Sequence, residues 1–127
     1  RLIFAEKLPL NKHLARLFLG DLAIDTFNYN GHTTTSDALW AGLPVLTKIG
    51  KSFAARVSAS LLTAIGLPEL IAYSEKEYED KALHIAKNPE ELIKLKSKLA
   101  KLLKTSSLYN SKLFTQNLED KFKELVK

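Results

Sequence analysis

The segment from Asn30 to Asp37 gathers residue types that suit an anionic ligand carrying hydroxyl groups. It lies between two apolar runs and includes a glycine, a histidine and three consecutive threonines. Gly31 gives the backbone freedom to turn. If a helix begins here, the positions from Thr33 to Ser36 expose N–H groups and hydroxyls at its positive end, which attracts phosphate. A nucleotide sugar is a ligand of this kind.

The residues alone leave two interpretations of this segment open. Thr34 and Asp37 have the spacing of a capping box that would place Asp37 in the first helical turn, so the polar residues would simply begin a helix. One hydroxyl is enough for a cap, which leaves His32 and the extra threonines without a role. We favour the ligand, because open α/β sheets bind ligands beyond the carboxyl ends of their strands. The N–H groups of Thr33 to Thr35 would then face a diphosphate, and Asp37 would accept hydrogen bonds from ribose hydroxyls.

His13 and Arg16 lie three residues apart, on one face near the start of a predicted helix. If that helix follows a parallel strand, its start faces the same crevice. The planar guanidinium of Arg16 would then pair with a phosphate or hold a base. The pattern by itself favours an ordinary surface arginine and a solvated histidine.

Other kinds of site find little support. Gly50-Lys51-Ser52 resembles the end of a phosphate-binding P-loop, but Val45 stands where that loop needs another glycine. No metal site is expected, since His13, His32 and His84 lack the spacing of metal ligands. The sequence also lacks the Gly-x-Ser-x-Gly motif of esterases. Trp40 is expected to belong to the core.

The composition is that of one ordinary domain. The chain has 127 residues, of which 46% are hydrophobic and 26% charged, and no cysteine, so we expect a cytoplasmic protein without disulfides. No signal peptide and no membrane-spanning stretch is visible. The net charge of +5 is spread over both halves and is not interleaved with aromatic residues, so nucleic acid is not an expected partner. Because the chain starts at Arg1 and contains no methionine, we expect a piece of a longer protein.

Short apolar runs alternate with helical patterns, which predicts an α/β fold with a mostly parallel sheet of about four strands and extra C-terminal helices. Strands are predicted at 2–5, 22–25, 45–47 and 70–73. Helices are predicted at 9–19, 35–41, 53–65, 75–87, 89–104 and 111–126. Ser74 and Glu77 form a capping box for one of these helices, and Pro89 suits the first turn of the next.

The whole run from Arg1 to about Val126 resembles the C-terminal end of the O-linked N-acetylglucosaminyltransferase family, which includes the plant SPINDLY proteins. The shared residues occur in order along the chain. They are Asn30-Gly31-His32-Thr33-Thr34, Asp37, Leu39-Trp40-Ala41-Gly42, Pro44, Ala54, Arg56-Val57, Ser60, Glu69-Leu70-Ile71-Ala72, Tyr78-Glu79 and Leu118-Glu119.

The resemblance implies a three-layer, Rossmann-like half of a glycosyltransferase B fold. The chain would be a single-domain fragment, residues 1–127, of the C-terminal lobe that holds the nucleotide sugar. His32, Thr33 and Thr34 look like the residues that bind the diphosphate, and Asp37 looks like the carboxylate that binds the ribose. His13 and Arg16 match positions that line the nucleotide site.

One departure bears on donor specificity. The family places a lysine near the ribose at the position that Leu10 occupies here.

The function implied by the resemblance is transfer of N-acetylglucosamine from UDP-N-acetylglucosamine to Ser or Thr of proteins, without a cofactor. The catalytic residues and the lobe that binds the protein acceptor are expected upstream of Arg1, so the fragment alone is expected to be inactive. Two alternatives remain. One is part of a protein O-fucosyltransferase that uses GDP-fucose. The other is a nonenzymatic module that binds a nucleotide or another protein.

Overall fold

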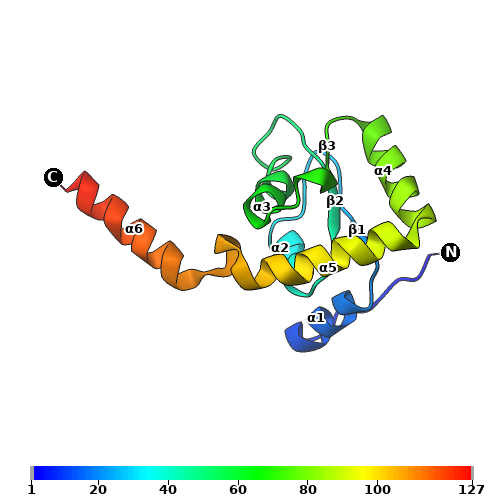
Figure 1. The fold of residues 1–127 in the computed structure, drawn as a ribbon, viewed down its shortest axis with the longest axis horizontal. Helices are drawn as coiled ribbons and strands as arrows, with labels where there is room; N and C mark the ends of the chain where they lie inside the picture. The colour runs from blue at the N-terminus through cyan, green and yellow to red at the C-terminus, as the bar shows by residue number, and fades with distance from the viewer. Residues whose placement is uncertain (1, 127) are drawn as a thin grey trace.

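Three short parallel strands form the centre of the computed structural model, which describes residues 2–126 (Figure 1). They are β1 (Ala23–Ile24), β2 (Val45–Lys48) and β3 (Ile71–Ala72), and their order in the sheet is β1-β2-β3. Ala23 pairs with Val45, Ile24 with Leu46, Thr47 with Ile71 and Lys48 with Ala72. All three carboxyl ends therefore lie at the same edge of the sheet.

Helices connect the strands and continue beyond them. The helices are α1 (Leu10–Phe18), α2 (Thr33–Trp40), α3 (Val57–Ile65), α4 (Glu75–Lys87), α5 (Pro89–Thr105) and α6 (Ser111–Leu125), with 3₁₀ turns η1 (Pro68–Leu70) and η2 (Ser107–Tyr109). The strands lie between α2 and α3 on one side and α4 on the other (Figure 1). The predicted α/β class and its layered arrangement are confirmed.

The core lies on both faces of the sheet. Val45, Leu46 and Thr47 of β2 are almost fully buried, as expected for a central parallel strand. The leucines that pack around this strand come from helices and turns distant in sequence, and those with at most 1% exposure are Leu39, Leu62, Leu67, Leu70 and Leu99. Leu99 shows that α5 belongs to this core.

Local sequence signals set several helix ends. Gly66 ends α3 with a φ of +95°, and its N–H donates to the Leu62 carbonyl at 3.1 Å. The Ser74 hydroxyl accepts a hydrogen bond from the Glu77 N–H at 3.1 Å, as the capping box predicts. The Glu77 carboxylate accepts from the N–H of Tyr73 at 2.8 Å. Pro89 occupies the first position of α5, also as predicted.

The predicted strand at 2–5 is wrong, so the described sheet has three strands, not about four. Leu2, Ile3 and Phe4 have no strand partner among residues 2–126 and are 86–94% exposed. A short apolar run becomes a strand only where a neighbour supplies hydrogen bonds. Two helix starts also differ: α2 begins at Thr33 and α3 at Val57.

The last helix, α6, extends away from the rest of the molecule (Figure 1). All of its residues are exposed, including the apolar side chains Phe114, Leu118 and Phe122. Within residues 2–126, no helix combines the length and apolar character needed to cross a membrane.

Candidate functional site

Asp25, directly after β1, holds the loop that leads to α2. Its Oδ1 accepts hydrogen bonds from the N–H groups of Thr26 at 2.9 Å and Gly31 at 2.8 Å. Its Oδ2 accepts from the Thr47 hydroxyl at 2.6 Å, and its carbonyl accepts from the Tyr78 hydroxyl at 2.7 Å. No role for Asp25 was predicted from the sequence. The signal available was a carboxylate at a strand end, followed by a polar loop with a glycine.

The far end of the loop is bound to the segment around the start of α3. The N–H of the buried Asn30 donates to the Ala54 carbonyl at 2.9 Å. The Ser58 hydroxyl donates to the Gly31 carbonyl at 2.9 Å and lies 2.8 Å from the hydroxyl of Thr35. These bonds place the first turn of α2 relative to the sheet and to α3.

Position 31 has no room for a side chain, so only glycine fits there. A Cβ at this position would lie 2.5 Å from the Thr35 hydroxyl oxygen and 2.7 Å from that of Thr34. Its φ is not positive, so our expectation that Gly31 serves to free the backbone is corrected. Because Gly31 has no side chain, the hydroxyls of Thr34 and Thr35 can lie close to its backbone.

The amino end of α2 has no side-chain cap. His32 is the N-cap residue, and the first bond of the helix runs from the Ser36 N–H to the His32 carbonyl at 3.1 Å. Among residues 2–126, the N–H groups of Thr33, Thr34 and Thr35 have no hydrogen-bond acceptor. The helix therefore presents unpaired donors at its positive end, where an anion binds well.

The capping-box interpretation of Thr34 and Asp37 is wrong, because the helix begins at Thr33 and not after Thr34. Asp37 consequently lies in the second turn, not the first. Its carboxylate makes no hydrogen bond or ion pair to residues 2–126. Burial raises the pKa of Tyr109, and the nearby charge of Asp37 raises it further. Asp37 thus remains available to a ligand.

His32 lies between two aromatic rings. It stacks on Tyr29 with ring centroids 5.0 Å apart and an interplanar angle of 13°, and the Phe53 ring meets it edge-on at 6.0 Å. Its Nε2 is buried and has no hydrogen-bond partner among the described residues. Buried polar atoms are nearly always paired, so this atom points to a ligand that completes the site.

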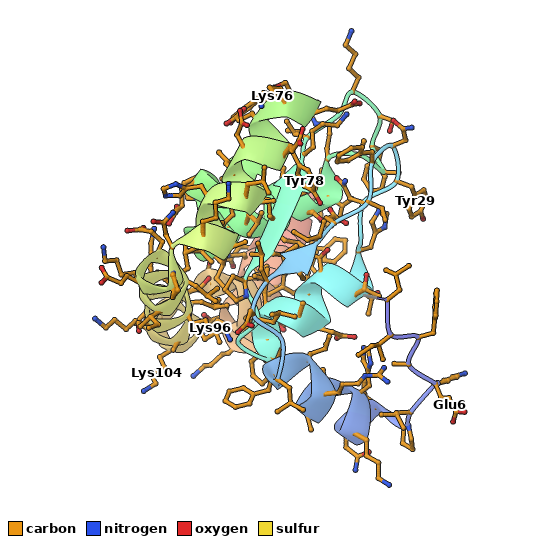
Figure 2. All side chains as sticks on the ribbon, turned by 90° about the vertical axis from the view of Figure 1, so that its right-hand side faces the viewer. Glu6, Tyr29, Lys76, Tyr78, Lys96 and Lys104 are labelled. Atoms are coloured by element: carbon orange, nitrogen blue, oxygen red, sulfur yellow. The ribbon has the colours of Figure 1, made fainter. Side chains whose placement is uncertain are left out.

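His13 and Arg16 interact on α1, as their spacing predicts. Arg16 Nη2 lies 3.1 Å from His13 Nδ1, and Arg16 Nη1 donates to the Glu6 carbonyl at 2.9 Å. Helix α1 packs against α2. In Figure 2, Glu6, just before α1, and Tyr29, beside the candidate site, lie on the same side of the molecule. No hydrogen bond or ion pair among residues 2–126 joins the His13–Arg16 pair to α2.

Leu10, Trp40 and His84 are all exposed on their helices or at a helix end. Leu10, the first residue of α1, is 65% exposed. His84 lies exposed on α4, and its carbonyl accepts from the Asn88 side chain at 2.7 Å. Trp40 is not in the core: it is 56% exposed and packs edge-on against Tyr109. Within residues 2–126, no group of three or more His, Cys, Asp or Glu side chains is placed to hold a metal ion.

Comparison with known proteins defines the class. Residues 1–118 match Glycosyl transferase family 41, and the chain belongs to that family. It is 34% identical over 120 residues to the UDP-N-acetylglucosamine–peptide N-acetylglucosaminyltransferase of Caenorhabditis elegans. That match covers 94% of this chain and 10% of the relative. It is 38% identical over 120 residues to SEC of Arabidopsis thaliana, a probable enzyme of the same name, and that match covers 94% of this chain and 12% of SEC.

A solved structure agrees with this assignment. The chain superimposes on a mutant of Thermobaculum terrenum O-GlcNAc transferase with a TM-score of 0.85 and 37% sequence identity. The match covers 92% of this chain and 22% of that one. The predicted resemblance to the O-linked N-acetylglucosaminyltransferase and SPINDLY proteins is confirmed, and the chain spans only a small part of the length of these relatives.

Proposed function

We propose that this chain is the donor-nucleotide-binding part of a protein O-glycosyltransferase, which transfers N-acetylglucosamine from UDP-N-acetylglucosamine to Ser or Thr of proteins. The observation that carries the proposal is the uncapped amino end of α2. It combines three unpaired N–H groups, at Thr33, Thr34 and Thr35, with the buried and unpaired Nε2 of His32.

The donor diphosphate binds at this end of α2. The N–H groups of Thr33 to Thr35 and the imidazole of His32 surround its oxygens. As the sugar leaves, negative charge builds on the diphosphate. Fixed donors at a helix amino end stabilise that charge without having to reorient, which is the usual way in which enzymes lower such a barrier.

The nucleoside is held by residues on either side of the diphosphate. Asp37 accepts hydrogen bonds from the ribose hydroxyls, which is consistent with its carboxylate having no partner in residues 2–126. His13 and Arg16 line the nucleotide site from α1. The contact of Arg16 with the Glu6 carbonyl orients its guanidinium and leaves donors free for the ligand.

The chain is a single-domain part of the C-terminal lobe of the larger enzyme. It covers 22% of the solved O-GlcNAc transferase chain and 10–12% of the relatives compared above. We expect the catalytic residues and the acceptor-binding lobe in the rest of the protein, and no transfer by this chain alone. A cytoplasmic location is also a prediction, which fractionation of cells expressing the whole protein would check.

Calorimetric titration with UDP, UMP and GDP tests the proposal. UDP is expected to bind more tightly than UMP, because the second phosphate meets the N–H groups of α2. UDP is expected to bind more tightly than GDP, and the reverse order would indicate a GDP-sugar donor. His32→Ala is expected to weaken UDP binding about tenfold or more, since hydrogen bonds to charged groups contribute roughly 1.5–3 kcal/mol.

The matched control is His84→Ala, which removes an exposed histidine from α4. It should leave the affinity for UDP unchanged. Equal affinities for UDP and UMP, or equal effects of the two histidine substitutions, would contradict the proposed function.

A further inference from the structure

The segment that follows α5 returns to α2, from which it is distant in sequence. The hydroxyl of Tyr109, in η2, donates a 2.8 Å hydrogen bond to the Ser36 carbonyl, 73 residues away. The Tyr109 ring also meets the Trp40 ring edge-on, with centroids 5.0 Å apart. Tyr109 therefore contacts α2 at two positions that are one helical turn apart.

These two contacts flank Asp37, the candidate ribose-binding residue. The Ser36 carbonyl belongs to the peptide group that joins Ser36 to Asp37, so a hydrogen bond to it restrains that planar group. Trp40 lies three residues after Asp37, on the same side of the helix. The opposite side of α2 lies in the core, and its buried residues are Thr35, Ala38 and Leu39. The side of α2 that carries Asp37 is thus restrained by Tyr109.

The 3₁₀ turn η2 is anchored as well, so it can act as a fixed support. The Ser106 hydroxyl accepts a hydrogen bond from the Leu108 N–H at 3.1 Å and donates to the Ala64 carbonyl of α3 at 3.3 Å. Leu108 and Tyr109 pack against the hydrophobic core. The position of Tyr109 is therefore set by α3 and the core, independently of its contacts with α2.

Asp37 needs such a support if it is to bind a ligand tightly. Its carboxylate has no hydrogen-bond or ion-pair partner in the described part of the chain, so no contact of its own side chain holds it. Its position depends on the helix backbone, and a group that is already in place loses less entropy when a ligand binds. The charge of Asp37 also contributes to the raised pKa of Tyr109, after the larger effect of burial, which is consistent with the two side chains being close.

We propose that Tyr109 is a positioning residue for ribose recognition: its hydroxyl and its ring fix the second turn of α2, so that the Asp37 carboxylate meets the ribose hydroxyls in a set orientation. Tyr109 acts through Asp37 and does not itself contact the nucleotide. This inference rests on the proposed function, in which Asp37 binds the ribose.

The test compares the affinities for UDP and 2′-deoxy-UDP by calorimetry. The unmodified protein is expected to bind UDP about tenfold more tightly, the factor that one hydrogen bond to a charged group provides. Tyr109→Phe keeps the ring beside Trp40 and removes only the hydroxyl. It should reduce the preference for UDP about threefold or more, because the carboxylate is no longer held in the orientation that the ribose needs.

The matched control is Tyr73→Phe, which removes the hydroxyl of a tyrosine that is 73% exposed and follows β3. It should leave the preference for UDP unchanged. A general loss of folding in Tyr109→Phe would weaken the binding of both nucleotides by the same factor. An unchanged ratio of the two affinities in Tyr109→Phe would therefore overturn the inference.

The double variant Asp37→Ala, Tyr109→Phe shows whether Tyr109 acts through Asp37. Asp37→Ala alone should remove the preference for UDP, and adding Tyr109→Phe should change the ratio no further. A further change of the ratio in the double variant would overturn the inference, because Tyr109 would then contribute without Asp37.

The same titrations separate this inference from the proposed function. If UDP binds with a preference over 2′-deoxy-UDP that Tyr109→Phe leaves intact, only the role of Tyr109 is overturned. If the unmodified protein does not bind UDP, the proposed function is contradicted and the role of Tyr109 is overturned with it.

Discussion

The hydroxyl of Thr47 donates a 2.6 Å hydrogen bond to the carboxylate of Asp25, and this bond joins the carboxyl ends of β1 and β2. The other oxygen of the same carboxylate holds the N–H of Gly31. The position of the amino end of α2 is consequently fixed by the sheet. A ligand at that end meets donors that are already in place, which reduces the entropy lost on binding.

Asp25→Ala is expected to lower the free energy of unfolding by about 2–3 kcal/mol, because it removes hydrogen bonds to a charged acceptor and leaves their donors unpaired. Urea unfolding monitored by circular dichroism measures this loss. The control is Asp21→Ala, since Asp21 is exposed and only pairs with Lys96 at 3.1 Å. Its effect should stay below about 1 kcal/mol. Similar losses in both variants would show that Asp25 does not hold the loop.

Gly31→Ala is expected to weaken UDP binding about tenfold or more, with a smaller effect on folding. The added methyl group would lie 2.5 Å from the Thr35 hydroxyl and would push the first turn of α2 out of position. Calorimetry with UDP measures the change. Gly20→Ala is the control, since its methyl group would meet nothing closer than 3.1 Å, the distance to a side-chain carbon of Leu43. Unchanged affinity in Gly31→Ala would mean that the first turn does not bind the diphosphate.

Asp37→Ala is expected to reduce the affinity for UDP while leaving the melting temperature nearly unchanged, because the carboxylate has no partner in residues 2–126. The sharper comparison uses 2′-deoxy-UDP. The unmodified protein should bind UDP more tightly than the deoxy analogue, and Asp37→Ala should remove that difference. A large loss of thermal stability with intact affinity would instead assign Asp37 to folding.

Stability is expected to fall between about pH 10 and pH 12 as Tyr78 ionises. Burial, followed by the charge of Asp25, raises the pKa of Tyr78 to about 12, whereas an unfolded tyrosine has a pKa of about 10. Since the folded state holds the proton more tightly, this contribution is complete below pH 10 and is lost as the pH rises through 12. Urea unfolding at pH 9 and pH 11 should show a larger loss in the unmodified protein than in Tyr78→Phe. Equal losses of stability in the unmodified protein and in Tyr78→Phe would mean that ionisation of Tyr78 is not the cause.

The elements that depend on nearby residues were predicted well from the sequence. The helices α4 and α5 follow from the capping residue Ser74, from Pro89 and from a regular apolar stripe. The central strand β2 follows from the short run Val45-Leu46-Thr47, which is rich in apolar and β-branched residues. In each case the signals lie within the element itself or beside it.

The details of the site depend on contacts between distant residues. The start of α2 was misplaced because Thr34 and Asp37 match a capping pattern, whereas the first turn is set by the bond between Thr35 and Ser58, 23 residues apart. Asp25 was overlooked because one of its partners, Thr47, lies 22 residues away. The residue types of the site could be read from the sequence, but their partners could not.

The most direct test of the diphosphate site at the amino end of α2 follows backbone amide signals by NMR during titration with UDP. We expect the amide protons of Thr33, Thr34 and Thr35 to move downfield as they form hydrogen bonds to the diphosphate, with accompanying changes at His32 and Arg16. The contradicting result is a well-folded sample in which UDP leaves these three amides unchanged, or in which the changes map to the lysine-rich surface of α5.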